Sequence, residues 1–264
     1  MFFVFKKDKI MAFLVACSTV FALFLMTSFF AKTPEDASIL TSTTQKQLPI
    51  YSVKTEEAKI ALTINCAWNA DDIDKILEVL EKEQVKVTFF MVGDWIEKND
   101  EAAKKIYNAG HELANHSYNH PHVNNMDYDK NAEQINKCSE LIKKITGKPS
   151  TLYRGPYGEY NNTVLQAAKD NSHQTIQWSI DSLDYNSLTG EQMWERIEPK
   201  LQNGSIILMH NGTENTANSL ELITRLGIIA ESDDEIEYQR EQDAWYGGIE
   251  HVANMREKIG TGYA

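Results

Sequence analysis

Polar side chains follow five β-rich runs of this chain, and their types are those that carry acid–base and metal chemistry. Each stands just after an apolar stretch such as ALTI, ELAN, TLY, QWSI or IILM. The residues are Asn65, His116, Arg154, the pair Asp181 and Asp184, and His210. Parallel strands bring their carboxyl ends to one face of a sheet, so we expect these residues to converge although they lie far apart in sequence. Such a set predicts a catalytic or binding site.

The stretch NHSYNHPH, residues 115–122, has the strongest metal-binding character. His116 and His120 are four residues apart, so one helical turn would bring both imidazoles to the same side, as a zinc, cobalt or nickel ion requires. His122 is a third candidate, although Pro121 is expected to turn it away. A polar loop that is rich in histidine is the alternative interpretation.

The segments between these residues alternate between strand-like and helical patterns. Strands are expected over residues 59–64, 85–92, 111–115, 151–153, 175–180 and 205–209. Helices are expected from residue 73 onward, over 100–109, along a face that includes Ile135 and Ile145 and ends at Gly147, and over 162–170 and 190–201. Successive βα units predict an α/β fold with a mostly parallel sheet and helices outside it, either open or closed as a barrel.

Composition excludes some classes of partner. The chain has 264 residues and a formal net charge of -12, so phosphate backbones would be repelled and a nucleic-acid partner is not expected. Three cysteines, of which Cys17 lies in the first apolar run, provide no disulfide framework. The oligomeric state is not indicated by the sequence.

The N-terminus predicts membrane attachment. Lys6, Lys7 and Lys9 in the short segment 1–9 precede an uncharged run of 22 residues, 10–31, that is long enough to cross a membrane as a helix. The leading positive charge predicts a single-pass cell-membrane anchor with the N-terminus inside and the rest of the chain exported. A cleaved signal peptide is the alternative. Residues 32–57, rich in Thr, Ser, Gln and Glu, are expected to be an extracytoplasmic linker.

The motifs HSYNH, YRGPYGEYN, WSIDSLDY and IILMHNG, in this order, resemble the successive motifs of the polysaccharide deacetylases, the NodB-homology or carbohydrate esterase family 4 proteins. The N-terminal anchor resembles that of the membrane-attached, sporulation-associated branch. The resemblance covers about residues 58–226. It implies a distorted (β/α) barrel that uses a divalent metal ion, zinc first among the candidates, to remove N-acetyl groups from amino sugars in a cell-wall or chitin-like glycan.

The resemblance also implies a role for each matching residue. His116 and His120 match the metal-binding histidines, and Arg154 matches the arginine that orients the catalytic base. Asp184 matches the carboxylate paired with the catalytic histidine, Asp181 opens the same motif, and His210 matches the general acid. Pro156 and Tyr157 match the groove wall, and Leu208 matches the apolar residue that lines the acetyl pocket.

The first motif departs from the family pattern. The family usually has TFDDG, with a base and then a metal ligand as its two aspartates, whereas this chain has Thr63, Ile64, Asn65 and Cys66. An amide is neutral and cannot act as a carboxylate base. Asp71 or Asp72 is a candidate substitute metal ligand, with helix capping as the alternative. Trp68, at the same strand end, is a candidate substrate-binding residue.

Two functions therefore stay open at this point. The first is a metal-dependent hydrolase that deacetylates a glycan at the cell envelope, with or without a substitute base, and the retained motifs favour it. The second is a catalytically impaired, membrane-anchored glycan-binding or regulatory relative. The C-terminal segment 227–264 is expected to be a divergent tail, because residues 231–246 are acidic and lack a buried-strand pattern, so the last barrel element is expected to be missing.

Overall fold

The computed structural model describes residues 18–19, 21, 47–213 and 215–229. The chain divides into two compact units, Met1–Gln45 and Lys46–Ala264. In the first unit only residues 18, 19 and 21 are described, and they are helical. Within the described ranges no helix has the length and hydrophobicity of a membrane span. The predicted anchor 10–31 lies almost wholly outside the described residues, and so does the predicted tail 227–264 apart from residues 227–229, which are helical, so both stay predictions.

The second unit is built on a parallel sheet in which β1 (Ala61–Cys66) has a strand paired on each side. The other strands are β2 (Thr88–Met91), β3 (Glu112–Asn115), β4 (Leu152–Tyr153), β5 (Gln174–Thr175), β6 (Ile180–Asp181) and β7 (Ile206–His210). Their order is β5-β4-β3-β2-β1-β7-β6, and every pairing is parallel. The parallel α/β sheet predicted from the alternating pattern is confirmed.

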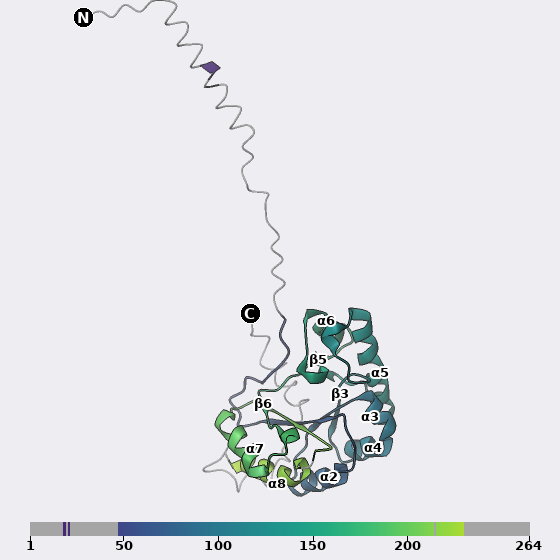
Figure 1. The fold of residues 1–264 in the computed structure, drawn as a ribbon, viewed down its shortest axis with the longest axis vertical. Helices are drawn as coiled ribbons and strands as arrows, with labels where there is room; N and C mark the ends of the chain where they lie inside the picture. The colour runs from purple at the N-terminus through teal and green to yellow at the C-terminus, as the bar shows by residue number, and fades with distance from the viewer. Residues whose placement is uncertain (1–17, 20, 22–46, 214, 230–264) are drawn as a thin grey trace, which may run out of the picture. The chain divides into compact units, whose positions relative to one another are not determined.

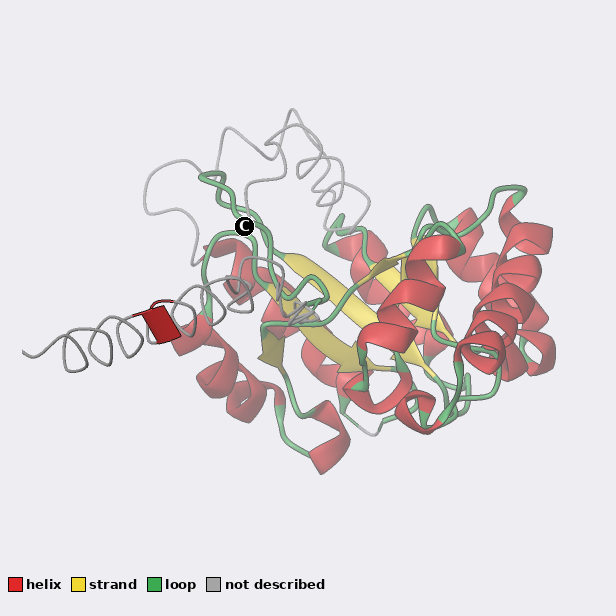
Figure 2. Cartoon of the chain, turned by 90° about the horizontal axis from the view of Figure 1, so that it is seen from above, coloured by secondary structure: helices red, strands yellow, loops and turns green. Residues whose placement is uncertain are grey.

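Helices cover the outside of the sheet. They are α2 (Ile73–Lys82), α3 (Gly93–Lys98), α4 (Asp100–Asn108), α5 (Tyr128–Thr146), α6 (Asn162–Asp170), α7 (Gly190–Ile197) and α8 (Thr216–Ile229). Figure 1 places α5 and α6 toward the β5 edge and α7 and α8 toward the β6 edge, and Figure 2 shows the strands between the helices. The predicted end of the long helix is confirmed, since α5 is capped by Gly147 at φ 72°.

The two faces of β1 have different surroundings because successive side chains alternate. Ile64 and Cys66 are fully buried among the apolar residues of the outer helices, for example Ile76. Ala61 instead belongs to a smaller apolar cluster with Phe90 and other residues of the inner face. Thr63 and Asn65 share the inner face with Ala61, so the end of β1 directs the Asn65 side chain toward the interior of the curved sheet.

The predicted single strand over 175–180 is wrong, since it divides into two strands at opposite edges of the sheet. The Ile176 amide donates to the Tyr153 carbonyl at 2.8 Å on one edge, and the Ser179 amide donates to the Ile206 carbonyl at 3.0 Å on the other. The chain therefore crosses between the edges within a few residues. This crossing curls the sheet into an incompletely closed barrel, which agrees with the distorted barrel that the resemblance implies.

The predicted linker 32–57 is wrong over its described part, because that part belongs to the fold. Ile50 bridges in parallel to Ile176, and Ser52 bridges in antiparallel fashion to Ser205. Val53 is buried in the inner apolar cluster. The segment thus joins the β5 side of the sheet to the start of β7, and the folded unit begins before residue 58.

Candidate active site

The carboxyl ends of the strands bring the predicted residues together. Asn65 on β1 and His210 on β7 are register partners in adjacent strands. His116 follows β3, and its amide donates to Met91 at the end of β2 at 3.0 Å. Arg154 follows β4, and its amide donates to the Asn115 carbonyl at 2.9 Å. The expected convergence at one face is confirmed for these four positions.

Arg154 lies at the bottom of the site and is fully buried. Its NH1 group donates to the Thr63 hydroxyl at 3.0 Å and to Asn65 Oδ1 at 2.9 Å. Its NH2 group donates to the Gln177 carbonyl at 3.0 Å, and its guanidinium carbon lies 4.0 Å from the centre of the Phe90 ring. Burial lowers the pKa of Arg154 to about 9. Among the described residues no carboxylate pairs with this guanidinium.

His116 and His120 form the predicted imidazole pair, but the predicted helical turn between them is wrong, because residues 116–120 form a loop with positive φ at Ser117 and His120. The His116 Nδ1 lies 2.7 Å from the Arg154 carbonyl oxygen, which only accepts, so Nδ1 carries the proton and Nε2 keeps a free lone pair. The two rings are 5.0 Å apart between centroids. Burial lowers the pKa of His116 well below its usual value and also lowers that of His120. Both rings are therefore neutral near pH 7, the state that ligates metals.

A third protein ligand is not brought to these histidines. Within the described part of the chain no group of three His, Cys, Asp or Glu side chains could hold a metal ion. Cys66 is fully buried in the outer core, where burial raises the pKa of its thiol and disfavours the thiolate. Two imidazoles are fewer than the three protein ligands of catalytic zinc sites, so these donors do not by themselves fit the predicted zinc ion.

Asp71 and Asp72 are not placed as the sequence suggested. Asp71 is exposed. Asp72 Oδ2 accepts from the Gly212 amide at 2.7 Å, and its Oδ1 lies 3.4 Å from Asn211 Nδ2. The capping alternative also fails for Asp72, since its side chain makes no cap bond to α2 although it occupies the N-cap position. The turn after β7 holds this carboxylate instead.

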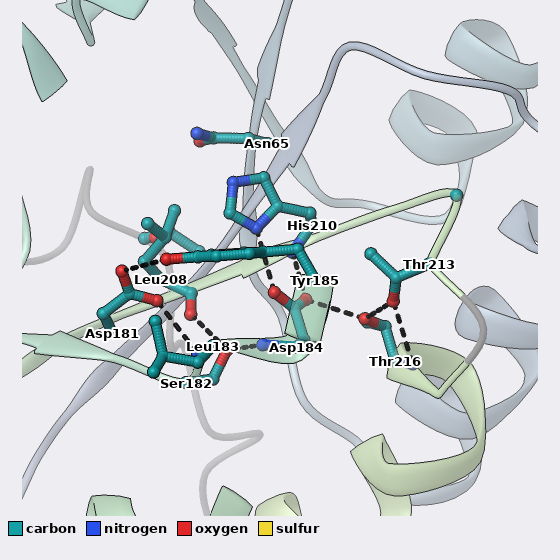
Figure 3. Close-up of polar contacts among 12 residues, drawn as sticks. Asn65, Asp181, Ser182, Leu183, Asp184, Tyr185, Leu208, His210, Thr213 and Thr216 are labelled. Carbon is teal, nitrogen blue, oxygen red and sulfur yellow. Dashed lines mark hydrogen bonds and ion pairs between the residues drawn. The ribbon is translucent and has the colours of Figure 1, made fainter. Parts of the chain in front are cut away.

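His210 has the environment expected of a general acid. Its Nδ1 donates to Asp184 Oδ1 at 2.9 Å, while the His210 amide and the Thr216 hydroxyl donate to Oδ2 at 2.5 and 2.7 Å. Figure 3 shows this chain of contacts, with Asn65 beside the imidazole. The buried carboxylate fixes the tautomer of His210, so its Nε2 is the nitrogen left to exchange a proton with a ligand. Thr216 could not be recognised from the sequence, because its contact depends on how α8 packs.

Aromatic rings flank His210. The Trp68 indole stacks on its imidazole at 5.3 Å between centroids and 30° between planes, and Tyr185 meets it edge-on at 5.3 Å. Asp181 does not touch His210, since its oxygens accept from the Leu183 amide at 2.9 Å and from the Tyr185 hydroxyl at 3.0 Å. Asp181 thus positions Tyr185, a residue that sequence reasoning missed although it directly follows Asp184.

Of the predicted groove-wall residues, Tyr157 contacts His120 and His122, and Pro156 directly precedes it. Pro156 begins a 3-10 turn (Pro156–Gly158), and Tyr157 within it is exposed and has φ 58°. The Tyr157 ring packs edge-on against His120 at 4.5 Å and lies flat on His122 at 4.2 Å. Leu208 is buried on β7 in register with Asp181, two residues before His210 and hence on the same face.

Comparison with known proteins agrees with this geometry. A family model described as polysaccharide deacetylase matches residues 52–176. A CE4 family pseudoenzyme from Bacillus anthracis superposes with a TM-score of 0.68 at 30% identity, over 78% of this chain and 68% of that one. The chain belongs to the polysaccharide deacetylase family.

Relatives within this family differ in their described activity. The chain is 37% identical to the uncharacterised protein YlxY of Bacillus subtilis and 31% identical to a peptidoglycan-N-acetylglucosamine deacetylase of Bacillus cereus, over 67% and 63% of its length. It spans 56% and 61% of those two proteins. A mutant of the Bacillus anthracis pseudoenzyme, described as having restored enzymatic activity, gives 32% identity and a TM-score of 0.66 over 68% of this chain and 66% of that one. Family membership alone therefore does not establish activity.

Proposed function

We propose that this chain binds an N-acetylated cell-wall glycan in the groove of the deacetylase fold and that its hydrolytic activity is impaired. One observation carries the proposal: Asn65 Oδ1 accepts from Arg154 at 2.9 Å, at the position where the family has its base. The arginine that would orient a carboxylate thus holds a neutral amide, which cannot accept the proton of an attacking water.

Amide hydrolysis needs a base for the attacking water and an acid for the leaving amine. The acid half is present, because Asp184 Oδ1 holds His210 Nδ1 at 2.9 Å and leaves Nε2 available for the amine. The base half is missing, since Asn65 occupies its place and Asp72 is bound to Gly212. The site can therefore orient an amino sugar and donate a proton, but its described residues provide no matching carboxylate base.

The family relationship supports the choice of ligand. The relatives include a peptidoglycan deacetylase named for N-acetylglucosamine and another, PdaA of Bacillus subtilis, named for N-acetylmuramic acid. PdaA is 29% identical over 79% of this chain and 82% of its own length. An N-acetylated peptidoglycan strand is accordingly the ligand class that we propose. The zinc, cobalt or nickel ion stays a prediction.

A slow deacetylase is the second candidate. The retained contacts among His210, Asp184 and Thr216 favour it, because binding a glycan does not require a histidine that is held by a buried carboxylate for proton transfer. This candidate predicts acetate release by the wild type that disappears in His210→Ala. Binding without turnover predicts no release in either protein.

The cellular context belongs to the proposal as well. The lysine-flanked apolar run 10–31 supports a single-pass anchor in the cell membrane that would hold the groove on the outer side, where peptidoglycan is found. A sporulation-associated role rests only on the resemblance of this N-terminal segment.

A sedimentation assay tests the proposal. Purified full-length protein is mixed with insoluble peptidoglycan, either fully N-acetylated or chemically de-N-acetylated, and acetate is measured in the supernatant. We expect retention on the acetylated form and acetate at the buffer level. Tyr157→Ala should reduce retention, whereas Tyr107→Ala, an equally aromatic surface change on α4, should not. Acetate release by the wild type with multiple turnovers would contradict impaired hydrolysis, and lack of retention would contradict glycan binding.

A further inference from the structure

Trp68 occupies an unusual position for so large an apolar side chain. It stacks on His210, yet 49% of its surface is exposed, whereas the His210 side chain is only 15% exposed. Among the described residues the indole Nε1 has no hydrogen-bond partner. The indole thus lies against the imidazole of the proposed acid and still offers an exposed aromatic surface to a ligand.

The loop that carries Trp68 is held in place from two sides. The Asn69 carbonyl accepts from the Trp95 indole at 3.2 Å and also from Asn211 Nδ2. Three residues later, Asp72 Oδ2 accepts from the Gly212 amide at 2.7 Å. These bonds tie the end of β1 to the turn that follows His210, across about 140 residues of sequence.

Gly212 shows how closely the two segments approach. It has φ 72°, a conformation that favours glycine, and a Cβ atom there would lie 3.0 Å from Trp68 Cβ. A side chain at this position would crowd the Cβ atom of Trp68 and the Asn69 backbone. The indole is therefore positioned by backbone contacts on both loops and by the Asp72 carboxylate.

We propose that Trp68 is the platform on which an amino-sugar ring stacks, and that Asp72 is a positioning residue that holds this platform beside His210. The proposal rests on the proposed function, because it takes the ligand to be an N-acetylated glycan. The nitrogen that His210 Nε2 would protonate is attached directly to the sugar ring. That ring must accordingly lie within reach of the imidazole, and the Trp68 indole, whose ring centroid lies 5.3 Å from that of His210, is an exposed aromatic surface beside it.

Binding of the N-acetylglucosamine tetramer to the full-length protein tests the platform. Intrinsic fluorescence should respond, because among the described tryptophans Trp68 is exposed, whereas Trp178 and Trp194 are only partly exposed and Trp95 is buried. Trp68→Ala should weaken binding by about tenfold or more, as truncation of a central aromatic contact does, while Trp68→Phe should lose the fluorescence response and retain part of the affinity. Tyr107→Ala serves as the exposed aromatic control and should bind like the wild type.

Two results would overturn the platform. Unchanged affinity of Trp68→Ala for a tetramer that the wild type binds would overturn it and leave the proposed function standing. A wild type that is retained on peptidoglycan but shows no affinity for the tetramer in either fluorescence or calorimetry would overturn the amino-sugar platform as well, again without contradicting glycan binding.

A pair of substitutions separates the positioning role of Asp72 from the metal role that the sequence suggested. Asp72→Asn retains an oxygen that can accept from the Gly212 amide, so its affinity for the tetramer should stay close to that of the wild type. Asp72→Ala removes the acceptor and should weaken binding. Zinc content after equilibration should be the same in the wild type and both variants. Zinc loss in Asp72→Asn would overturn the assignment in favour of a metal ligand, and wild-type affinity in Asp72→Ala would overturn the positioning role.

Discussion

At residue 65, one amide in place of a carboxylate changes the electrostatics of the whole site. Arg154 is fully buried, and its guanidinium is stabilised by carbonyl dipoles, the Thr63 hydroxyl, the Asn65 amide and the faces of Phe90 and Trp178. Burial already lowers its pKa to about 9. A carboxylate at position 65 would accept the same NH1 hydrogen bond and also neutralise this charge.

The role of Asp184 in positioning His210, the proposed general acid, can be tested by substitution. In the Asn65→Asp background, Asp184→Asn should lower kcat by roughly 10²-fold or more with little change in KM, because the amide cannot hold His210 in the tautomer that leaves Nε2 available. Asp181→Asn is the matched control, since Asp181 contacts Tyr185 and the Leu183 amide and does not contact His210. Steady-state kinetics of acetate release measure both. Equal losses in the two variants would contradict the role given to Asp184.

Some site residues were predictable from sequence and others were not. Asn65 and His210 lie at the carboxyl ends of β1 and β7, and His116 and Arg154 directly follow β3 and β4, so parallel topology alone places all four at one face. Asp72 could not be placed, because its orientation depends on the Gly212 amide some 140 residues later. The neighbouring residues in the sequence do not show whether an aspartate ligates a metal ion or accepts a hydrogen bond from a turn.

At the scale of elements, the sequence predicted most strands and helices but not the crossing at 176–179. TIQWSI is a continuous β-rich run, so local pattern assigns one strand. Its division depends on tertiary hydrogen bonds to β4 and β7 at opposite edges. The inclusion of residues 50–53 in the fold could not be predicted for the same reason. A segment of polar composition has the pattern of a linker whether or not its backbone pairs with a strand.

His111 joins two elements and makes their junction sensitive to pH. Its Nδ1 accepts from the Val87 amide at 3.2 Å, just before β2, and burial together with the charge of Lys86 lowers its pKa to about 4. The unfolded chain takes up this proton near pH 6.5, whereas the folded chain does not. The stability associated with a neutral His111 is therefore present above pH 6.5 and is lost as the pH falls toward 4, by roughly 2–3 kcal/mol.

Urea denaturation at pH 7 and pH 4.5 measures this loss. His111→Asn retains an acceptor for the Val87 amide without the titration, so its free energy of unfolding should fall less over this interval than that of the wild type. His116, His120 and His173 are unchanged in both proteins, so their own depressed pKa values cancel in the comparison. Identical pH dependence in the two proteins would mean that His111 is not neutral in the fold.

At the scale of the whole molecule, the run 10–31 predicts where the folded unit works. We expect the full-length chain to sediment with membranes and to be removed from intact protoplasts by added protease, because the leading lysines favour an inside N-terminus. A chain that begins at residue 46, the start of the second compact unit, should no longer sediment with membranes. Complete protection of the full-length chain in protoplasts would contradict an extracytoplasmic location.

The fold and the family relationship were largely predictable, since four ordered motifs identify the deacetylases. Activity was not, because the similar proteins include two that are described as deacetylases and one that is described as a pseudoenzyme. The impairment that we propose for this chain rests on the end of β1, where Asn65 and Cys66 stand and no carboxylate does.

Acetate release from the N-acetylglucosamine tetramer, compared between the wild type and Asn65→Asp in buffer containing Zn²⁺ or Co²⁺, tests the account most directly. The substitution supplies a carboxylate beside Arg154 and opposite His210, so release should rise by about 10²–10⁴-fold, the usual contribution of a general base. The further change His210→Ala should remove this gain. Release by the wild type at the rate of Asn65→Asp, or no gain in the variant although it binds the tetramer, would contradict the claim that the missing base is what silences this site.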